Sequence, residues 1–282
     1  MAVRHGIRGE CVRIVTWDEA IAGAFGLEPP PAAATIGVFD GVHRGHRELV
    51  RRVLKKAPGK VPVAVTFREN PKRVTAPHRF AGDLFTLDQK LEALDDLGLT
   101  VCVLIDFSGD FSKLGGNEFI STLVGSCGVR FFAVGSDFKC GYRLSTDAHD
   151  VREIAAGFHA EVDVVEPVLV DGEKVSSSGI RAAVTRGRMD LALAMLGRPY
   201  TLDLRGLETE SNHGLLDVVP GKRGFVLPRF GNYVGTLVTD SRKSVVSISV
   251  RHGHIRARAD FLEGRPLFLE FDPEHDYTKQ GE

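Results

Sequence analysis

Two histidines at the end of a glycine-rich segment are the strongest candidates for chemistry in this sequence. His43 and His46 close residues 35–46, which read TIGVFDGVHRGH. Gly37 and Gly41 allow the backbone to approach a ligand closely. A helix is predicted to begin directly after His43, and its first N–H groups and positive dipole end attract anions. We therefore predict a phosphate cradle in which the two imidazoles can donate hydrogen bonds to a polyphosphate.

Two other interpretations of this segment stay open. The glycines could make a simple turn while the histidines cap a helix, which is the commoner role of an isolated H-x-G-H. A zinc site would need a further pair of His or Cys ligands elsewhere, and none is obvious. We favour phosphate binding because T-x-G-x-F-D-G precedes the histidines and places a buried strand, a turn and a helix in succession.

Three more stretches carry polar groups at predicted turns. Gly135 and Asp137 follow a strand end, where open α/β sheets bind ligands, so Asp137 could accept from a ribose or an adenine, or cap a helix. Three serines at 176–178 precede Arg181 by one helical turn, which suits the β- and γ-phosphates of ATP or a plain helix cap. Residues 70–71 could be a functional loop or a simple turn.

The elements that must position these groups alternate between strand and helix up to about residue 200. Strands are predicted at 35–39, 61–67, 101–105, 131–134 and 162–165. Helices are predicted at 44–56, 86–97, 117–123, 151–159, 178–186 and 189–196. This alternation predicts an α/β fold, a Rossmann-like parallel sheet covered by helices on both faces.

The pattern changes after residue 200. Strands are predicted at 225–227, 233–239, 245–250, 255–261 and 267–271, two of them joined by a turn at His252-Gly253. Apolar and polar residues alternate in this part, which predicts a small antiparallel β-barrel, and residues 274–282 are predicted to fray. We therefore predict two domains, residues 1–200 and residues 201–282.

Composition excludes several classes of protein. The chain has 282 residues and a formal net charge of -1, which gives no bulk reason to expect nucleic acid or an anionic membrane as partner. No run of about 18 apolar residues predicts a transmembrane helix, and the N-terminus lacks the apolar core of a secretory signal. Four scattered cysteines without a C-x-x-C pair predict free thiols in a reduced cytoplasm.

Four motifs in order resemble those of one family. Residues 35–46 resemble the T-x-G-x-F-D-G-x-H-x-G-H signature of the H-x-G-H nucleotidyltransferases, in the form of the bacterial FAD synthetases that are usually fused to a riboflavin kinase. TFRENP at 66–71 resembles T-F-x-P-H-P, VGSDFKCG at 134–141 resembles V-G-x-D-F-x-F-G, and VSSSGIR at 175–181 resembles I-S-S-T-x-I-R. With GRPY at 197–200, the resemblance covers about residues 35–200.

This resemblance implies an FMN adenylyltransferase, which makes FAD and pyrophosphate from FMN and ATP. Mg²⁺ would be held mainly by ATP oxygens and water, with no protein metal ligand predicted. The implied catalytic residues are His43, His46 and Arg181. The implied ATP-binding residues are Gly37, Phe39, Asp40, Gly41, Gly135, Asp137, Ser177, Ser178 and Arg181. The implied flavin-binding residues are Phe67, Asn70, Pro71, Phe138 and Cys140.

Several departures from the family pattern bear on the function that the resemblance implies. Asn70 replaces a histidine and Cys140 replaces a phenylalanine, so flavin specificity is open. The Pro-Thr-Ala-Asn stretch of a riboflavin kinase does not follow Tyr200, so riboflavin kinase activity is predicted to be absent. A transferase acting on another acceptor and a non-catalytic flavin or nucleotide binder remain alternatives.

Overall fold

The chain folds into two compact units. The computed structural model describes residues 12–23, 31–212, 214–220, 224–251, 254–259 and 263–273. The first unit comprises Met1–His78 and Leu87–Val168, and the second comprises Arg79–Thr86 and Leu169–Glu282. A short segment from the N-terminal part of the chain thus belongs to the second unit. The predicted domain boundary at residue 200 stays a prediction.

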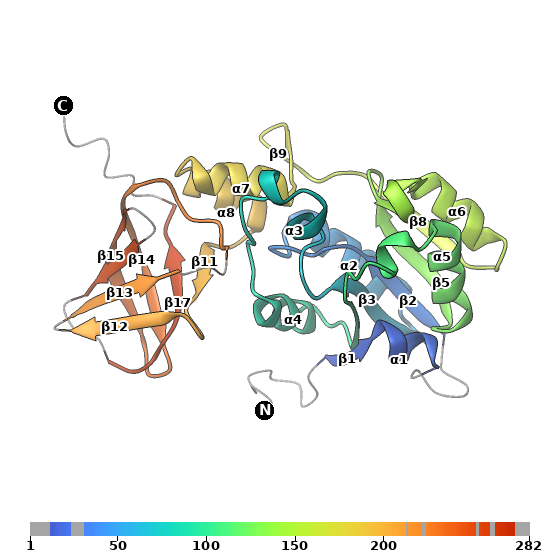
Figure 1. The fold of residues 1–282 in the computed structure, drawn as a ribbon, viewed down its shortest axis with the longest axis horizontal. Helices are drawn as coiled ribbons and strands as arrows, with labels where there is room; N and C mark the ends of the chain where they lie inside the picture. Colours follow the sequence, from blue (N-terminus) through green and yellow to red (C-terminus); the bar gives the residue numbers. More distant parts are fainter. Residues whose placement is uncertain are drawn as a thin grey trace. The chain divides into compact units, whose positions relative to one another are not determined.

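The first unit contains the predicted parallel sheet, which is confirmed (Figure 1). All its strands are parallel and lie in the order β1-β4-β3-β2-β5-β8. They are β1 (Arg13–Thr16), β2 (Ala32–Ile36), β3 (Val61–Phe67), β4 (Val101–Ile105), β5 (Val129–Gly135) and β8 (Glu161–Val165). Sequence analysis missed β1 and placed β2 three residues too late. β2 ends at Ile36 because the backbone then turns, with Phe39 at a φ of 50°.

Helices cover both faces of this sheet. They are α1 (Trp17–Ile21), α2 (Arg44–Lys56), α3 (Lys72–Thr75), α4 (Leu87–Asp96), α5 (Gly116–Gly125) and α6 (Ala148–Ala156). Residues of α1, α5 and α6 join alternate residues of the strands in one apolar core, which includes Phe119, Leu123 and Val151 of the helices and Ala34 of β2. α2 packs on the other face, because its spacing of apolar residues buries one side of the helix. A hairpin of β6 (Lys139–Cys140) and β7 (Thr146–Asp147) precedes α6.

The second unit contains a curled antiparallel sheet of seven strands, a half-barrel (Figure 1). α7 (Ser177–Thr185) and α8 (Met189–Leu196) follow the small hairpin of β9 (Leu169–Val170) and β10 (Glu173–Lys174). The half-barrel strands are β11 (Tyr200–Asp203), β12 (Glu208–Asn212), β13 (Leu215–Val219), β14 (Gly231–Thr239), β15 (Lys243–Arg251), β16 (His254–Arg258) and β17 (Pro266–Phe271). Their order is β11-β17-β14-β15-β16-β13-β12.

The predicted antiparallel pairing of β15 with β16 is confirmed, and buried residues alternate along both strands. The predicted strand at 225–227 is wrong. Phe225 forms only an isolated parallel bridge with Asp83, a partner from a distant part of the sequence. Sequence analysis also missed β11, β12 and β13. The predicted turn at His252-Gly253 and the predicted frayed tail lie outside the described residues.

Candidate functional site

Three of the four sequence motifs meet at one edge of the parallel sheet. β2 lies between β3 and β5, so the loops that follow these three strands are neighbours at their carboxyl ends. The chain runs from β2 to β3 and β4 on one side, and then to β5 and β8 on the other. β2 and β5 therefore flank the point where the winding direction reverses, which is where open α/β sheets bind ligands.

The loop between β2 and α2 is strained, and contacts with the core and with β3 hold it in place. Phe39 and Val42 both have a positive φ, 50° and 37°, which typically costs about 1–3 kcal/mol for each residue. The Phe39 side chain is completely buried, and a Cβ on Gly37 would lie 3.3 Å from its ring. Thr66 of β3 donates its hydroxyl to the Val38 carbonyl oxygen at 3.1 Å. Gly37 thus leaves room for the Phe39 ring. The close approach of Gly37 to a ligand stays a prediction.

His43 and His46 lie together at the start of α2. His43 is the N-cap residue, and its Nδ1 accepts the backbone N–H of His46 at 3.3 Å. The two imidazoles stack with centroids 3.6 Å apart, and the His46 ring also meets the edge of Phe39 at 5.0 Å. Because Nδ1 of His43 accepts, the neutral ring carries its proton on Nε2. The predicted cap is therefore present, and the role of the ring in chemistry stays a prediction.

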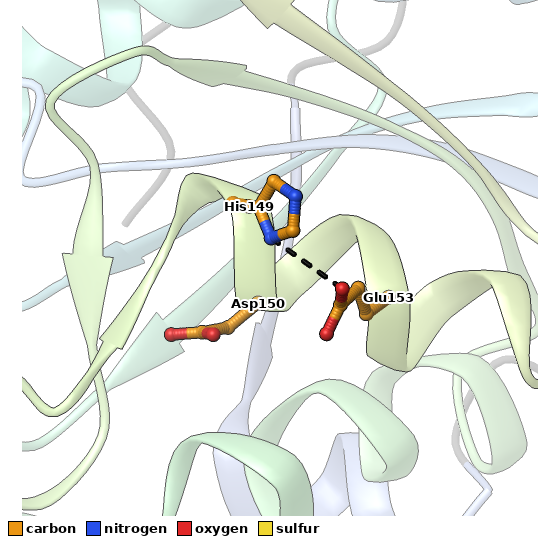
Figure 2. A group of neighbouring side chains, drawn as sticks. All are labelled: His149, Asp150 and Glu153. Atoms are coloured by element: carbon orange, nitrogen blue, oxygen red, sulfur yellow. Dashed lines mark ion pairs between the residues drawn. The ribbon is translucent and has the colours of Figure 1, made fainter.

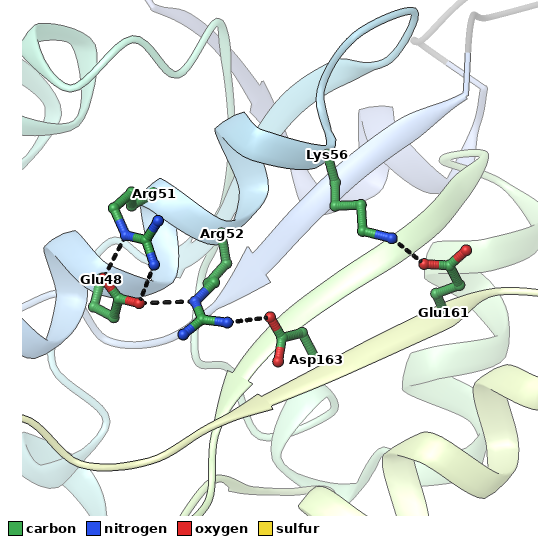
Figure 3. A network of polar contacts seen from close by, with 6 residues as sticks. All are labelled: Glu48, Arg51, Arg52, Lys56, Glu161 and Asp163. Atoms are coloured by element: carbon green, nitrogen blue, oxygen red, sulfur yellow. Dashed lines mark hydrogen bonds and ion pairs between the residues drawn. The ribbon is translucent and has the colours of Figure 1, made fainter.

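Ion pairs connect α2 to β8 at the edge of the sheet (Figure 3). Arg52 bonds both Glu48, one turn earlier at 2.7 Å, and Asp163 of β8 at 3.2 Å. Lys56, one turn later, bonds Glu161 at 2.6 Å. Hydrogen bonds from Arg51 and Arg52 lower the pKa of Glu48 to about 2. Two of these ion pairs, Arg52 with Asp163 and Lys56 with Glu161, thus join α2 to β8.

Asn70 reaches the same edge from β3. Its side chain is buried, its Nδ2 lies 3.5 Å from Oδ2 of the buried Asp40, and its Oδ1 accepts the backbone N–H of Lys72 at 3.1 Å. The structure thus joins two predicted site residues from different motifs. Pro71 is the N-cap residue of α3. The amide that replaces the family histidine braces the Asp40 loop.

An aromatic group lies at the carboxyl ends of β3 and β4. The Phe67 ring meets Phe107 and Phe111 edge to face at 5.9 and 6.0 Å. Trp17 and Phe119 pack against Phe111 at 5.5 and 5.8 Å. Sequence analysis selected Phe67 and missed Phe107 and Phe111. The signal was an F-x-x-x-F spacing directly after a buried strand, at the edge where ligands bind.

The loop after β5 supplies the third motif. Asp137 is exposed, and its Oδ1 would lie 3.1 Å from a Cβ on Gly135, so this glycine gives the carboxylate room. Phe138 and Cys140 are half-buried and pack against the core of the first unit. Burial, with a smaller contribution from Asp150, raises the pKa of the Cys140 thiol to about 12. Cys140 therefore stays a neutral thiol at physiological pH.

The fourth motif belongs to the second unit. The Ser176 hydroxyl accepts the backbone N–H of Gly179 at 3.1 Å and is the N-cap of α7, which confirms the predicted cap. Ser177 and Ser178 form the first turn of the helix. Arg181 is 8% exposed, and its Nε donates to the Gly82 carbonyl oxygen at 2.7 Å.

One group of potential metal ligands lies on α6 among the described residues (Figure 2). Atoms of His149, Asp150 and Glu153 lie within 4.8 Å of one another. His149 pairs with Glu153 at 3.6 Å, and Asp150 accepts the backbone N–H of Asp147 in the cap of the helix. These contacts account for the grouping without an ion, and no sequence motif includes these residues.

The model of the FAD synthetase family matches residues 27–179, which is more than half of the chain. The chain belongs to the FAD synthetase family. Its match begins before the loop that carries the stacked histidines and ends within the first turn of α7.

Relatives of this FAD synthetase family member are bifunctional. The bifunctional riboflavin kinase/FMN adenylyltransferase of Escherichia coli (strain K12) is 30% identical over 191 residues, which are 66% of this chain and 61% of that protein. The protein of the same description from Buchnera aphidicola is 27% identical over 178 residues, 62% of this chain and 57% of that protein. The similarity thus spans about three fifths of the length of these curated relatives.

One solved structure is similar to this FAD synthetase family member over almost its whole length. The crystal structure of a protein described as a macrolide-efflux protein from Streptococcus pneumoniae has a TM-score of 0.80 and 25% sequence identity. It covers 93% of this chain and 90% of its own. Both compact units of this chain therefore have counterparts in one solved protein. No helix in the described part of this chain is long and apolar enough to cross a membrane.

Proposed function

We propose that this chain is an FMN adenylyltransferase, which joins FMN to the AMP part of ATP and releases pyrophosphate. One observation carries the proposal: two stacked histidines, the N-cap His43 and His46 of the first turn, lie at the start of α2 at the winding reversal of the sheet, in a member of the FAD synthetase family. The α2 N-terminus and an imidazole donor together form a cradle for an anionic group.

The reaction requires positioning more than a strong base. A phosphate oxygen of FMN attacks the α-phosphorus of ATP in line, a new P–O bond forms, and the bond to the bridging oxygen of pyrophosphate breaks. The attacking oxygen is already anionic, so no proton has to be removed from it. The chain has to align two anions and stabilise the charge that develops on the α-phosphate.

His43 and His46 suit the α-phosphate. The hydrogen bond at Nδ1 of His43 leaves Nε2–H as the donor position of that ring. The His46 ring stacks on His43 and also contacts the Phe39 ring, and these two contacts keep it in place. The buried Phe39 ring, the hydrogen bond from Thr66 and the Asp40–Asn70 contact hold this strained loop before substrate binds. Donors that are fixed in advance are effective in stabilising a transition state.

The remaining predicted residues suit the other parts of the two substrates. Phe67, together with the Phe107 and Phe111 that adjoin it, offers aromatic edges for an isoalloxazine. Asp137 is an exposed acceptor for ribose hydroxyls. Ser177 and Arg181 suit the leaving pyrophosphate. The role of Arg181 and the serines rests on their chemistry and on the family motif.

Magnesium fits this proposal as part of the ATP substrate. Asp40, the carboxylate in the loop that precedes the histidines, is buried and bonded to Asn70, so the loop offers no preformed carboxylate cage. ATP oxygens and water would supply the ligands, and the ion would neutralise phosphate charge. The residues of the chain bind and orient the phosphates, whether or not the ion is bound.

The experiment is incubation of the full chain with FMN, ATP and Mg²⁺, followed by chromatography for FAD and pyrophosphate. We expect both products in equal amounts. Pyrophosphate without FAD when other acceptors are offered would indicate a transferase of different specificity. ATP binding with no product would indicate a nucleotide binder. Riboflavin offered in place of FMN should yield no FMN, because the Pro-Thr-Ala-Asn stretch is absent.

A further inference from the structure

Residues 79–86, which we call the strap, leave the first unit and are built into the second. The backbone N–H of Asp83 donates to the Gly224 carbonyl oxygen at 2.8 Å, and the Asp83 carbonyl oxygen accepts the N–H of Val226 at 3.1 Å. The strap thus pairs with residues 224–226, between β13 and β14 of the half-barrel, as a short parallel bridge. Tyr200 of β11 holds the same segment by donating its hydroxyl to the Val226 carbonyl oxygen at 2.5 Å.

The strap fits only with a glycine at its centre. Gly82 has a φ of +113°, a conformation that other residues rarely adopt. A Cβ there would collide with the Gly224 carbonyl oxygen and lie 2.6 Å from the Phe225 carbonyl carbon. The two backbones therefore touch at this point.

Side chains fasten the rest of the strap to the second unit. Leu84 and Phe85 are buried, and the Arg198 guanidinium lies 4.6 Å from the Phe85 ring centroid. The Thr86 hydroxyl donates to Oδ2 of the buried Asp203 of β11 at 2.8 Å. Backbone pairing, apolar burial and a side-chain bond thus all hold the strap against the half-barrel unit.

The strap in turn holds Arg181. The Nε of this arginine donates to the Gly82 carbonyl oxygen, and its guanidinium lies 5.2 Å from the Phe80 ring centroid. Gly82 and Phe80 both belong to the strap. Because a guanidinium is planar, a bond at Nε and contact with a ring together set the direction of its two remaining nitrogens.

We propose that the strap is a positioning element through which the half-barrel orients Arg181 toward the phosphates of ATP. The proposal rests on the proposed function, in which Arg181 binds the triphosphate. It assigns the half-barrel a part in nucleotide binding that requires no kinase chemistry. Gly82 is a positioning residue here, because it acts on the nucleotide only through Arg181.

The test compares two glycine substitutions in the same unit. Gly82→Ala should separate the strap from residues 224–226 and break the hydrogen bond between Arg181 Nε and the Gly82 carbonyl oxygen. Arg181 would then be misaligned for ATP, and we expect ATP binding to weaken about tenfold or more, which is the usual effect of losing one hydrogen bond to a charged group. Gly172→Ala is the matched control, because Gly172 also has a positive φ, +79°, but nothing lies within 4 Å of its Cβ position. Gly172→Ala should leave ATP affinity at the parent value. Calorimetric titration with ATP measures the dissociation constant of each protein.

A double variant separates positioning from general damage. If the strap acts through Arg181, adding Gly82→Ala to Arg181→Ala should weaken ATP binding no further. The proposal would be overturned if the losses of ATP affinity in the two single variants multiplied in the double variant, or if Gly82→Ala kept the parent affinity. If Gly82→Ala does not fold, Phe80→Leu removes the aromatic partner with less disturbance and is judged by the same comparison.

Failure of the proposed function shows in a different measurement. A full chain that binds ATP but makes no FAD contradicts the adenylyltransferase, while the affinity comparison still decides the role of the strap. A full chain that does not bind ATP overturns the role of the strap as well.

Discussion

At the residue scale, His43 combines two roles that substitution can separate. Its Nδ1 caps α2, and its Nε2 carries the proton proposed to reach the α-phosphate. His43→Ala loses both, so we expect a loss of about 1 kcal/mol of stability and roughly 10²–10³ in turnover. His43→Asn keeps a side-chain oxygen that can accept the His46 N–H, so we expect near-parent stability with the same loss of turnover.

Melting temperature and the rate of FAD formation, measured on both variants, decide this prediction. His46→Ala should also lose roughly 10²–10³ in turnover, while ATP affinity falls much less because the helix N-terminus remains. If His43→Asn forms FAD at the parent rate, the ring is only a cap and the catalytic assignment is wrong.

At the element scale, ion pairs within α2 link its stability to pH. The pKa of Glu48 is lowered from its ordinary 4.5 to about 2 by its bonds to Arg51 and Arg52. A carboxyl whose pKa is lowered on folding stabilises the fold fully above its unfolded pKa, and loses that contribution as the pH falls through the folded pKa. The pair with Arg52 is partly exposed, so the contribution is on the order of 1 kcal/mol or less.

We therefore expect Glu48→Gln to unfold more easily than the parent chain at pH 7, and the two free energies of unfolding to converge between about pH 4.5 and pH 2. Urea titrations at a series of pH values measure this. Glu208→Gln, which changes an exposed residue of β12, is the control and should show a constant difference. A Glu48→Gln difference that also stays constant down to pH 3 would show that α2 does not depend on this charge.

At the scale of the whole molecule, the contacts of the strap allow a truncated chain to test where the first domain ends. A chain that stops at residue 200 keeps the parallel sheet and its core, so we expect it to fold. It loses residues 224–226 and Asp203, which hold Asp83 and Thr86. We expect its ATP affinity to fall about as far as that of Gly82→Ala.

Circular dichroism and calorimetric titration of this fragment beside the full chain provide the measurement. Parent affinity in the fragment would support a self-sufficient nucleotide-binding domain of residues 1–200 and contradict the role of the half-barrel. An unfolded fragment would place the boundary elsewhere in the chain.

Local patterns in the sequence were sufficient for the elements that bury one regular face. Alternation of strands with helices predicted the parallel sheet, and period two predicted the pairing of β15 with β16. The cap at Ser176 was also readable, because a hydroxyl and the N–H three residues later are neighbours along the chain. The short β1 was missed, since four residues with one buried side chain carry almost no period.

Contacts between distant residues were decided only by the tertiary structure. No local pattern pairs Asn70 with Asp40, adds Phe107 and Phe111 to Phe67, or brings Gly82 to Arg181. Strand order puts the first two sets at one sheet edge, and a glycine with a positive φ lets the strap meet the half-barrel. A periodic pattern reports which side of an element is buried. The partner that buries it depends on chain topology and on single backbone angles, which periodicity does not contain.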